Sequence, residues 1–389
     1  MIDKLKKIFS SDNQASRRYI TGIVLGMLLF TVGTLGQLQG SSKEDISEPG
    51  LNELFNTVLF HVKNDYVEEV SAKELWFGAI RGMLKALDDA HTRFMSPDEY
   101  NELQVETRGN FGGLGIEISV KDGYLTVVSP IEDTPAMRAG LKPGDQIIEI
   151  DKKPTKEMNL VKAVKILRGT PGTSINITVL REDEREPLHF DIVREVIKIK
   201  VVESKIIDNE NIGYVKLKQF SQTSSSDMLN IVQDFQNKKV KGIILDLRWN
   251  PGGLLDAAHK IANLFIKEGV IVSTRGRKKE LDREFPADPK RAIAADIPLA
   301  ILANEGSASI SEIVTGAVKD LKRGTFIGEK TFGKGSVQNV IPLPYNTAIA
   351  LTIQKYYTPS GVSIHKKGIK PDIEIKAFEF SKEDKEALR

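Results

Sequence analysis

The 389-residue sequence contains no cysteine, few histidines and no excess of charge of one sign. Without cysteine the chain forms no disulfide or thiolate metal site and has no thiol nucleophile or cysteine-linked lipid. Its five histidines leave few candidates for a histidine-based catalytic triad. The 55 Lys and Arg nearly balance the 53 Asp and Glu, a net charge of +2, so bulk electrostatics indicates no nucleic-acid partner.

Long apolar runs are also missing, with one exception near the N-terminus. The run ITGIVLGMLLFTVGTLG, residues 20–36, carries no charge and follows a basic segment, residues 1–19. At about 1.5 Å per residue, roughly 17–20 residues is the shortest helix that crosses a bilayer. The basic flank should stay in the cytoplasm, which sends the rest of the chain to the periplasm or cell surface. We expect an uncleaved transmembrane anchor; a cleaved signal segment is the alternative, although GQLQGSS offers no clear small-x-small site.

The region after the anchor predicts a linker, 37–50, and a helical region, 51–110. Two stripes of apolar residues recur there at helical spacing, and a Ser-Pro pair at 96–97 suits the cap and first turn of a further helix. We expect both stripes to pack into a core, with a homodimer interface as the alternative. The stripes are Leu51, Leu54, Phe55, Val58, Leu59 and Val62, and Leu75, Trp76, Ala79, Ile80, Met83, Leu84 and Leu87.

Two further domains follow from a change of pattern at residue 111. Short strands and glycine turns fill 111–195, the length of a small peptide-binding module. Strands and helices then alternate over 196–376, which predicts a layered α/β core with parallel strands. Residues 377–389 form a polar tail.

The glycine turn FGGLGIEI predicts a peptide-binding edge. Such a turn aims backbone N–H groups at a peptide's terminal carboxylate while the peptide adds a strand beside residues 116–120. A helix over 159–168 would form the far wall, with Val161, Val164 or Leu167 lining a side-chain pocket. Together with AGLKPGD, these segments resemble a PDZ domain, whose peptide-binding residues would be Gly113, Leu114, Gly115, Ile116, Val164, Leu167 and Arg168.

Two further turns stand next to predicted helices. In LDLRWNPGG, residues 245–253, an apolar strand ends in a Pro-Gly-Gly turn, whose N–H groups can stabilise an oxyanion or simply form an ordinary strand-to-helix connection. In NEGSASISEI, residues 304–313, serines occupy 307, 309 and 311. Ser309 and Glu312 fit a capping box, so this segment either begins a helix or also carries a nucleophile.

The segment TFGKGSVQNV, residues 331–340, has three interpretations. Read from Gly328 it approaches a nucleotide-binding P-loop, but Gly335 replaces the required hydroxyl, and SVQNVIPLP predicts a strand rather than a helix. As a strand it would place Lys334 and Gln338 on one face. Lys334 is then either a solvated surface lysine or a general base that needs an apolar pocket, for which Phe332, Val337 and Val340 are the candidates.

A histidine-based triad is the remaining alternative. His259 or His365 could approach a serine, but neither lies in a recognisable partner motif. The GSASI segment also lacks the G-x-S-x-G pattern of a nucleophile elbow. His61, His91 and His189 lie in the first helix, the LDDAHTRF loop and the end of the PDZ-like region.

Taken in order, these segments resemble the carboxyl-terminal processing proteases, PDZ-containing serine endopeptidases with a Ser-Lys pair. The resemblance covers about 51–375 and includes GAIRGMLKALDD, LDLRWNPGG, NEGSASISEI, GEKTFGKGSVQ and YYTPSGVSIHKKGIKPDIEI. It implies an α/β protease core with an inserted PDZ domain and no cofactor or metal. The implied roles are nucleophile for Ser309, general base for Lys334, support of that lysine for Gln338, and oxyanion hole for Gly252 and Gly253.

The resemblance also implies how substrates are chosen. Proteins with free C-terminal tails would bind the PDZ groove before cleavage, and Arg168 is a candidate for coupling the two events. The alternative role of Arg168 is to cap the C-terminus of its helix. The sequence departs from the family at Trp249, where a small polar residue is usual, and at Ala90, where a proline would precede His91. A proteolytically inactive PDZ scaffold is the rival function.

Overall fold

The computed structural model describes residues 47–376, so the basic segment, the predicted anchor at 20–36 and the polar tail lie outside the described residues. Within 47–376, no helix has the length and apolar character needed to cross a membrane. The chain divides into two compact units between Trp76 and Phe77, and each is described by itself.

The N-terminal unit contains α3 (Glu48–Asp65) and the start of α4 (Ala72–Lys85). The Ser47 side chain caps α3 by accepting a hydrogen bond from the Gly50 N–H, and Phe55 packs against Trp76 with ring centroids 5.6 Å apart. Neither helix has a buried residue. The expectation that both apolar stripes pack into a core is therefore wrong: most of the first stripe is exposed, and Leu75, Ala79, Ile80 and Leu84 of the second are only half-buried.

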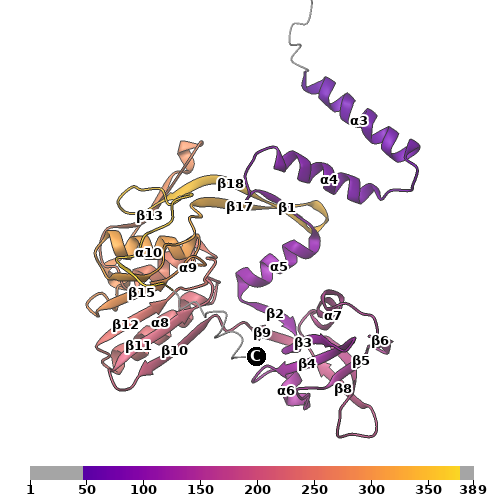
Figure 1. The fold of residues 1–389 in the computed structure, drawn as a ribbon, viewed down its shortest axis with the longest axis horizontal. Coiled ribbons are helices and arrows are strands. Elements are labelled where there is room, and N and C mark those ends of the chain that lie inside the picture. The colour runs from indigo at the N-terminus through magenta and orange to yellow at the C-terminus, as the bar shows by residue number, and fades with distance from the viewer. Residues whose placement is uncertain (1–46, 377–389) are drawn as a thin grey trace, which may run out of the picture. The chain divides into compact units, whose positions relative to one another are not determined.

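The protease core is a six-stranded sheet with three helices (Figure 1). The last five strands in the order β10-β11-β12-β15-β16-β19 are parallel, as the sequence predicts, and β10 is antiparallel. The elements are β10 (Val202–Ile207), β11 (Ile212–Leu217), α8 (Ser224–Asn237), β12 (Gly242–Asp246), α9 (Leu255–Asn263), β15 (Leu299–Ala303), α10 (Ile310–Asp320), β16 (Thr325–Gly328) and β19 (Ile373–Glu374).

A second, antiparallel sheet completes this domain. Its strands are β1 (Arg93–Met95), β18 (Thr347–Tyr357), β13 (Val270–Gly276) and β14 (Arg283–Pro286), with β17 (Ser336–Leu343) paired to β18. Three short 3₁₀ turns lie at Lys279–Leu281, Pro289–Arg291 and Pro344–Asn346. The TRF segment, predicted as a loop, is thus a strand of this sheet. α5 (Pro97–Arg108) follows it and begins with the expected Ser96 cap, reinforced by Glu99.

The PDZ region folds around its own sheet, with the order β3-β4-β5-β7-β8. β3 is an edge strand, as peptide addition requires. The elements are β2 (Asn110–Gly113), β3 (Ile116–Lys121), β4 (Tyr124–Pro130), α6 (Pro135–Ala139), β5 (Gln146–Ile150), β6 (Lys153–Pro154), α7 (Leu160–Leu167), β7 (Ser174–Leu180), β8 (Leu188–Val193) and β9 (Glu195–Lys198). β2 pairs with β9 as a separate ribbon through which the chain enters and leaves the domain.

Candidate active site

Ser309 stands at the N-terminus of α10 in an unusual backbone conformation. It is the N-cap residue, with φ 56° and ψ −113°, and is only 7% exposed. A side chain on Gly252 would lie 3.0 Å from the Ser309 Cβ and 3.1 Å from the Ile310 nitrogen. The Pro-Gly-Gly turn therefore needs glycine at position 252, because this turn meets the turn that carries Ser309 without room for a Cβ.

One buried carboxylate connects the serine turn to the lysine turn. Glu312 accepts hydrogen bonds from the backbone N–H groups of Ser309, Gly333 and Lys334 at 2.7–2.8 Å and from the Thr331 hydroxyl at 2.6 Å. The bond to Ser309 is the carboxylate half of the predicted capping box. Burial raises the pKa of Glu312, and the four hydrogen bonds oppose that rise. This residue fixes the relative positions of Ser309 and Lys334.

Lys334 is half-buried and lies in a cleft of about 790 Å³ that Ser309 also lines. Burial lowers the pKa of Lys334, and the nearby positive charge of Arg93 lowers it further, while Asp89 and Glu312 act in the opposite direction. A lysine in this setting is partly neutral at lower pH than a solvated one and can accept a proton. The arrangement favours the general-base interpretation over the surface-lysine one.

The apolar walls around Lys334 differ from those that the sequence indicates. Phe332 was expected to desolvate the lysine, yet its side chain is 64% exposed. Of the other two candidates, Val340 lines the cleft and Val337 is not a lining residue. Residues distant in the sequence supply the rest of the apolar wall, because the cleft is formed where α5, β17, β18 and the Pro-Gly-Gly turn meet. They include Tyr100, Leu103, Phe220, Leu254, Ala350 and Tyr356.

Gln338 lines the same cleft, but its side chain forms hydrogen bonds with residues other than Lys334. Its amide nitrogen donates to the Ser336 hydroxyl at 2.8 Å and to the Thr352 hydroxyl at 3.1 Å. β17 begins at Ser336 and its register shifts between Val337 and Gln338, so simple strand alternation does not extend back to Lys334. The cleft nevertheless brings Lys334 and Gln338 to one face. The strand also excludes a P-loop, which must open a helix.

Backbone N–H groups next to Ser309 differ in their availability as oxyanion donors. The Gly252 N–H donates to the Asn250 side chain at 2.9 Å. In the part of the chain that the structure describes, neither Gly253 nor Ile310 has a recorded acceptor for its N–H. Ile310 follows Ser309 at the first turn of α10, where N–H groups are unpaired by nature. Sequence motifs drew attention to the glycines and missed Ile310.

The histidines occupy different environments. His259 binds the Pro286 carbonyl at 2.8 Å and is not a lining residue of the cleft, and Nδ1 of His365 is buried without a hydrogen bond within the described residues. His91 does line the cleft, and burial together with the charge of Lys334 lowers its pKa. No sequence pattern indicated this, because the pairing of β1 with β18 brings the LDDAHTRF segment to the cleft only in the folded chain.

Trp249 does not crowd the cleft. Its indole is 66% exposed and lies against Gly306, on which a Cβ would come within 2.2 Å of the ring. The Trp249 backbone N–H donates to the Asn304 side-chain oxygen at 3.0 Å, which ties the Pro-Gly-Gly turn to the serine turn. The described residues also contain no cluster of His, Cys, Asp or Glu suited to a metal ion.

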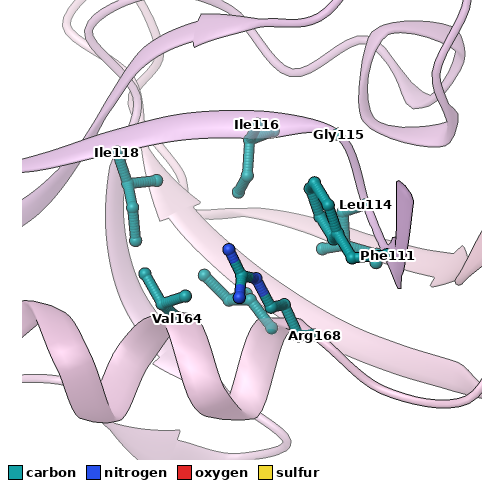
Figure 2. A pocket seen from close by; sticks show the side chains of 9 residues that line it. Phe111, Leu114, Gly115, Ile116, Ile118, Val164 and Arg168 are labelled. Carbon is teal, nitrogen blue, oxygen red and sulfur yellow. The ribbon is translucent and has the colours of Figure 1, made fainter. Parts of the chain in front are cut away.

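The PDZ region presents a separate apolar pocket of about 140 Å³ between β3 and α7 (Figure 2). Every predicted peptide-binding residue lines it: Gly113, Leu114, Gly115, Ile116, Val164, Leu167 and Arg168. Phe111 and Ile118 also line it and were missed. Val161 is 76% exposed on α7 and is not a lining residue, because the short helix turns only one face to β3.

Arg168 ends α7 and lies at the edge of this pocket (Figure 2). Its backbone N–H bonds the Val164 carbonyl at 2.9 Å, while its guanidinium pairs with Glu102 of α5 at 2.6 Å and stacks 4.7 Å from the Phe111 ring centroid. Only the backbone caps the helix. The side chain instead connects the peptide pocket to α5, whose residues also line the catalytic cleft.

Three family descriptions match the chain. Residues 211–375 match peptidase family S41, residues 126–181 match a PDZ domain, and residues 36–99 match the N-terminal domain of the activating protease CtpB. These matches follow the same division into protease core, PDZ domain and N-terminal helices as the fold.

Curated relatives agree with these matches over most of their length. A carboxy-terminal-processing protease of Bartonella bacilliformis is 44% identical over 325 residues, which cover 82% of this chain and 74% of the relative. Carboxy-terminal processing protease CtpA of Bacillus subtilis is 34% identical over 93% of this chain and 77% of its own length. A carboxyl-terminal-processing protease of Synechocystis is 36% identical over 84% and 78%. The chain therefore belongs to the carboxy-terminal processing proteases, which are serine peptidases of family S41.

Proposed function

We propose that the protein is a Ser-Lys endopeptidase in which Ser309 is the nucleophile and Lys334 the general base. The observation that carries this proposal is the common placement of both residues in one cleft, with their backbones bound to the same buried Glu312. A half-buried lysine with a lowered pKa beside a serine at a helix N-terminus suits proton transfer and oxyanion stabilisation.

The reaction follows from this arrangement. Neutral Lys334 Nζ takes the proton from Ser309 Oγ as the oxygen attacks a peptide carbonyl. The Gly253 and Ile310 N–H groups donate to the resulting oxyanion. Gly252, which has no side chain, lets the Pro-Gly-Gly turn lie close to the turn that carries Ser309. Lys334 then protonates the leaving amine, and water repeats the sequence on the acyl-enzyme. Gln338 supports the lysine through the cleft wall that it forms with Ser336 and Thr352.

We further propose that the PDZ pocket selects proteins by their C-terminal tails. The edge strand β3 can accept a peptide strand, and the pocket between Ile116, Ile118 and Val164 suits an apolar terminal side chain. Arg168 would relay occupancy to α5 through Glu102. The exposed apolar stripes of α3 and α4 support a homodimer, since large exposed apolar surfaces mark contact sites.

The location belongs to the same proposal. The apolar run 20–36 with its basic flank supports a single anchor in the cytoplasmic membrane and an extracytoplasmic peptidase. Accessibility of the chain to an added protease tests this in cells whose cytoplasmic membrane is intact and whose outer membrane, where present, has been permeabilised. Degradation supports the proposal, and full protection that ends only on lysis contradicts it.

Proteolysis of an unfolded protein substrate with an apolar C-terminus tests the catalytic assignment. The parent should cleave it, while Ser309→Ala and Lys334→Ala should each lose about 10⁴-fold or more in kcat/KM. Glu305→Ala, at an exposed residue of the same turn, is the matched control and should keep the chemistry. Cleavage that persists in Lys334→Ala but not in Ser309→Ala would assign the base elsewhere, with His91 the first candidate. No cleavage by the parent with an occupied PDZ pocket would favour an inactive scaffold.

A further inference from the structure

A buried arginine lies behind the peptide pocket of the PDZ region. Arg194 stands between β8 and β9 and is only 8% exposed. Its guanidinium donates hydrogen bonds at 2.9–3.2 Å to four neutral oxygen atoms, which are the backbone carbonyls of Ile166, Leu167 and Ser174 and the Thr173 hydroxyl. Among residues 47–376, no carboxylate forms an ion pair with Arg194. The PDZ region therefore holds a buried positive charge without a negative partner of its own.

The hydrogen bonds of Arg194 explain only part of this arrangement. Two of the acceptors, Ile166 and Leu167, are the last residues of α7, whose carbonyls have no partner within the helix. These carbonyls need donors, but they do not need a full charge. Burying a charge costs more than burying a neutral donor, unless a negative group offsets the cost. A bound ligand can supply such a group.

Close backbone contacts connect Arg194 to the glycine turn of the pocket. A Cβ on Gly169 would lie 2.8 Å from the Arg194 Nε, so this glycine lies directly against the guanidinium. The Gly169 N–H donates to the Gly112 carbonyl at 3.0 Å, and Leu114 follows two residues later. Leu167, whose carbonyl binds Arg194, lines the same pocket of about 140 Å³ as Leu114. The guanidinium therefore lies on the order of 10 Å from the Leu114 backbone.

The glycine turn offers backbone donors to a ligand. In the part of the chain that the structure describes, the N–H groups of Leu114 and Gly115 have no recorded acceptor, although both residues are buried. Buried backbone N–H groups in native proteins are nearly always paired. Both residues line the pocket (Figure 2), where the carboxylate at the end of a peptide would accept these two N–H groups.

We propose, on the basis of the tail recognition proposed above, that the buried charge of Arg194 selects the terminal carboxylate of a tail bound at Leu114 and Gly115. The other arginine of the pocket, Arg168, is paired with Glu102, so that pair adds little net charge. Arg194 has no such partner, and its burial protects it from screening by salt. At an effective dielectric constant of about 20, opposite charges about 10 Å apart change an affinity by about tenfold.

Fluorescence anisotropy with two peptides tests this proposal on the full chain carrying Ser309→Ala. The peptides share one sequence with an apolar last residue and an N-terminal dye; one ends in a free carboxylate and the other in an amide. The Ser309→Ala chain should bind the acid more tightly than the amide. Adding Arg194→Gln should reduce this preference at least about fivefold, whereas Arg194→Lys should keep most of it, even where both affinities fall. The control Arg168→Gln/Glu102→Gln removes an ion pair without changing the net charge and should alter the preference less than about twofold.

The outcomes distinguish failure of this proposal from failure of tail recognition itself. If neither peptide binds, tail recognition by the pocket is wrong and the role of Arg194 falls with it. If the acid and the amide bind equally, or if Arg194→Gln weakens both to the same extent, Arg194 has only a structural role. Salt provides a measurement that does not depend on the folding of a variant. The preference should fall less than about threefold between about 20 and 500 mM salt, and its complete loss would assign it to exposed cations instead.

Discussion

The catalytic cleft and the PDZ pocket are held in place by opposite kinds of contact. In the cleft, a fully buried Glu312 receives four hydrogen bonds from the turns that carry Ser309 and Lys334. At the pocket, Arg168 is held by an exposed ion pair with Glu102 and by stacking on Phe111. Buried hydrogen-bonded charges are costly to break, whereas exposed ion pairs contribute little. The contacts that join the two turns at Glu312 should therefore resist disruption more strongly than the contact between Arg168 and Glu102.

The largest effect should come from Glu312→Ala. The substitution leaves three backbone N–H groups and the Thr331 hydroxyl without their acceptor. We expect a loss of about 3 kcal/mol or more in the free energy of unfolding and at least about 100-fold in kcat, because the two catalytic turns lose their common anchor. Urea denaturation and steady-state kinetics measure both quantities. Glu305→Ala, in the same segment but exposed, is the control; similar values for both variants would contradict the anchoring role.

Lys334→Met separates activity from stability. It should abolish cleavage and yet stabilise the fold at neutral pH, since the folded chain holds Lys334 with a lowered pKa. In the unfolded chain Lys334 binds its proton more tightly, with a pKa of about 10.4. Lys334 therefore lowers the free energy of unfolding by its full amount at pH values below its folded pKa. This loss disappears as the pH rises past about 10.4. The advantage of the methionine variant should therefore shrink as pH rises.

Denaturant midpoints of parent and variant between pH 7 and 10 check this prediction. A constant or growing advantage would mean that folding does not lower the pKa of Lys334. The pH dependence of kcat is a second check. The value of kcat should rise with pH through the lowered pKa of Lys334 and then level off.

Local sequence patterns predicted several of the elements that form the cleft and the PDZ pocket. Helix periodicity predicted a helix over 159–168, and α7 spans Leu160–Leu167. The Pro-Gly-Gly turn leads from a strand into α9, which begins at Leu255, as the strand-to-helix interpretation predicts. Capping chemistry predicted the Ser96 and Glu312 contacts. These features depend on residues a few positions apart, which the sequence displays directly.

Contacts between distant segments escaped the same reasoning. The Thr352 N–H donates to the Thr92 hydroxyl, a pair separated by 260 residues, and this contact helps to bring His91 to the cleft. Phe332 is close to Lys334 in sequence but exposed, while Tyr356, a distant residue, lines the cleft. Which apolar residue desolvates the lysine depends on sheet pairing, and no local pattern encodes that.

A smaller effect, confined to recognition, should follow from Val164→Asp. A carboxylate in the apolar pocket would oppose the apolar end of a bound tail, and we expect about 10- to 100-fold weaker peptide binding. Val161→Asp makes the same change three residues earlier on the exposed face and should leave binding intact. Fluorescence anisotropy with a peptide ending in a free apolar residue measures both. Equal losses would place the peptide outside the pocket.

The smallest change in stability should come from Arg168→Gln, and it bears most directly on how the two regions communicate. Two exposed ion pairs join α7 to α5: Arg168 with Glu102 at 2.6 Å and Lys165 with Asp98 at 2.7 Å. Removing either should cost less than about 1 kcal/mol, because both are exposed to solvent. Only Arg168 also lines the peptide pocket and stacks on Phe111. Arg168→Gln should therefore reduce the stimulation of cleavage by an added C-terminal peptide, whereas Lys165→Gln should preserve it. Equal stimulation in both variants would mean that peptide occupancy reaches the cleft by another route.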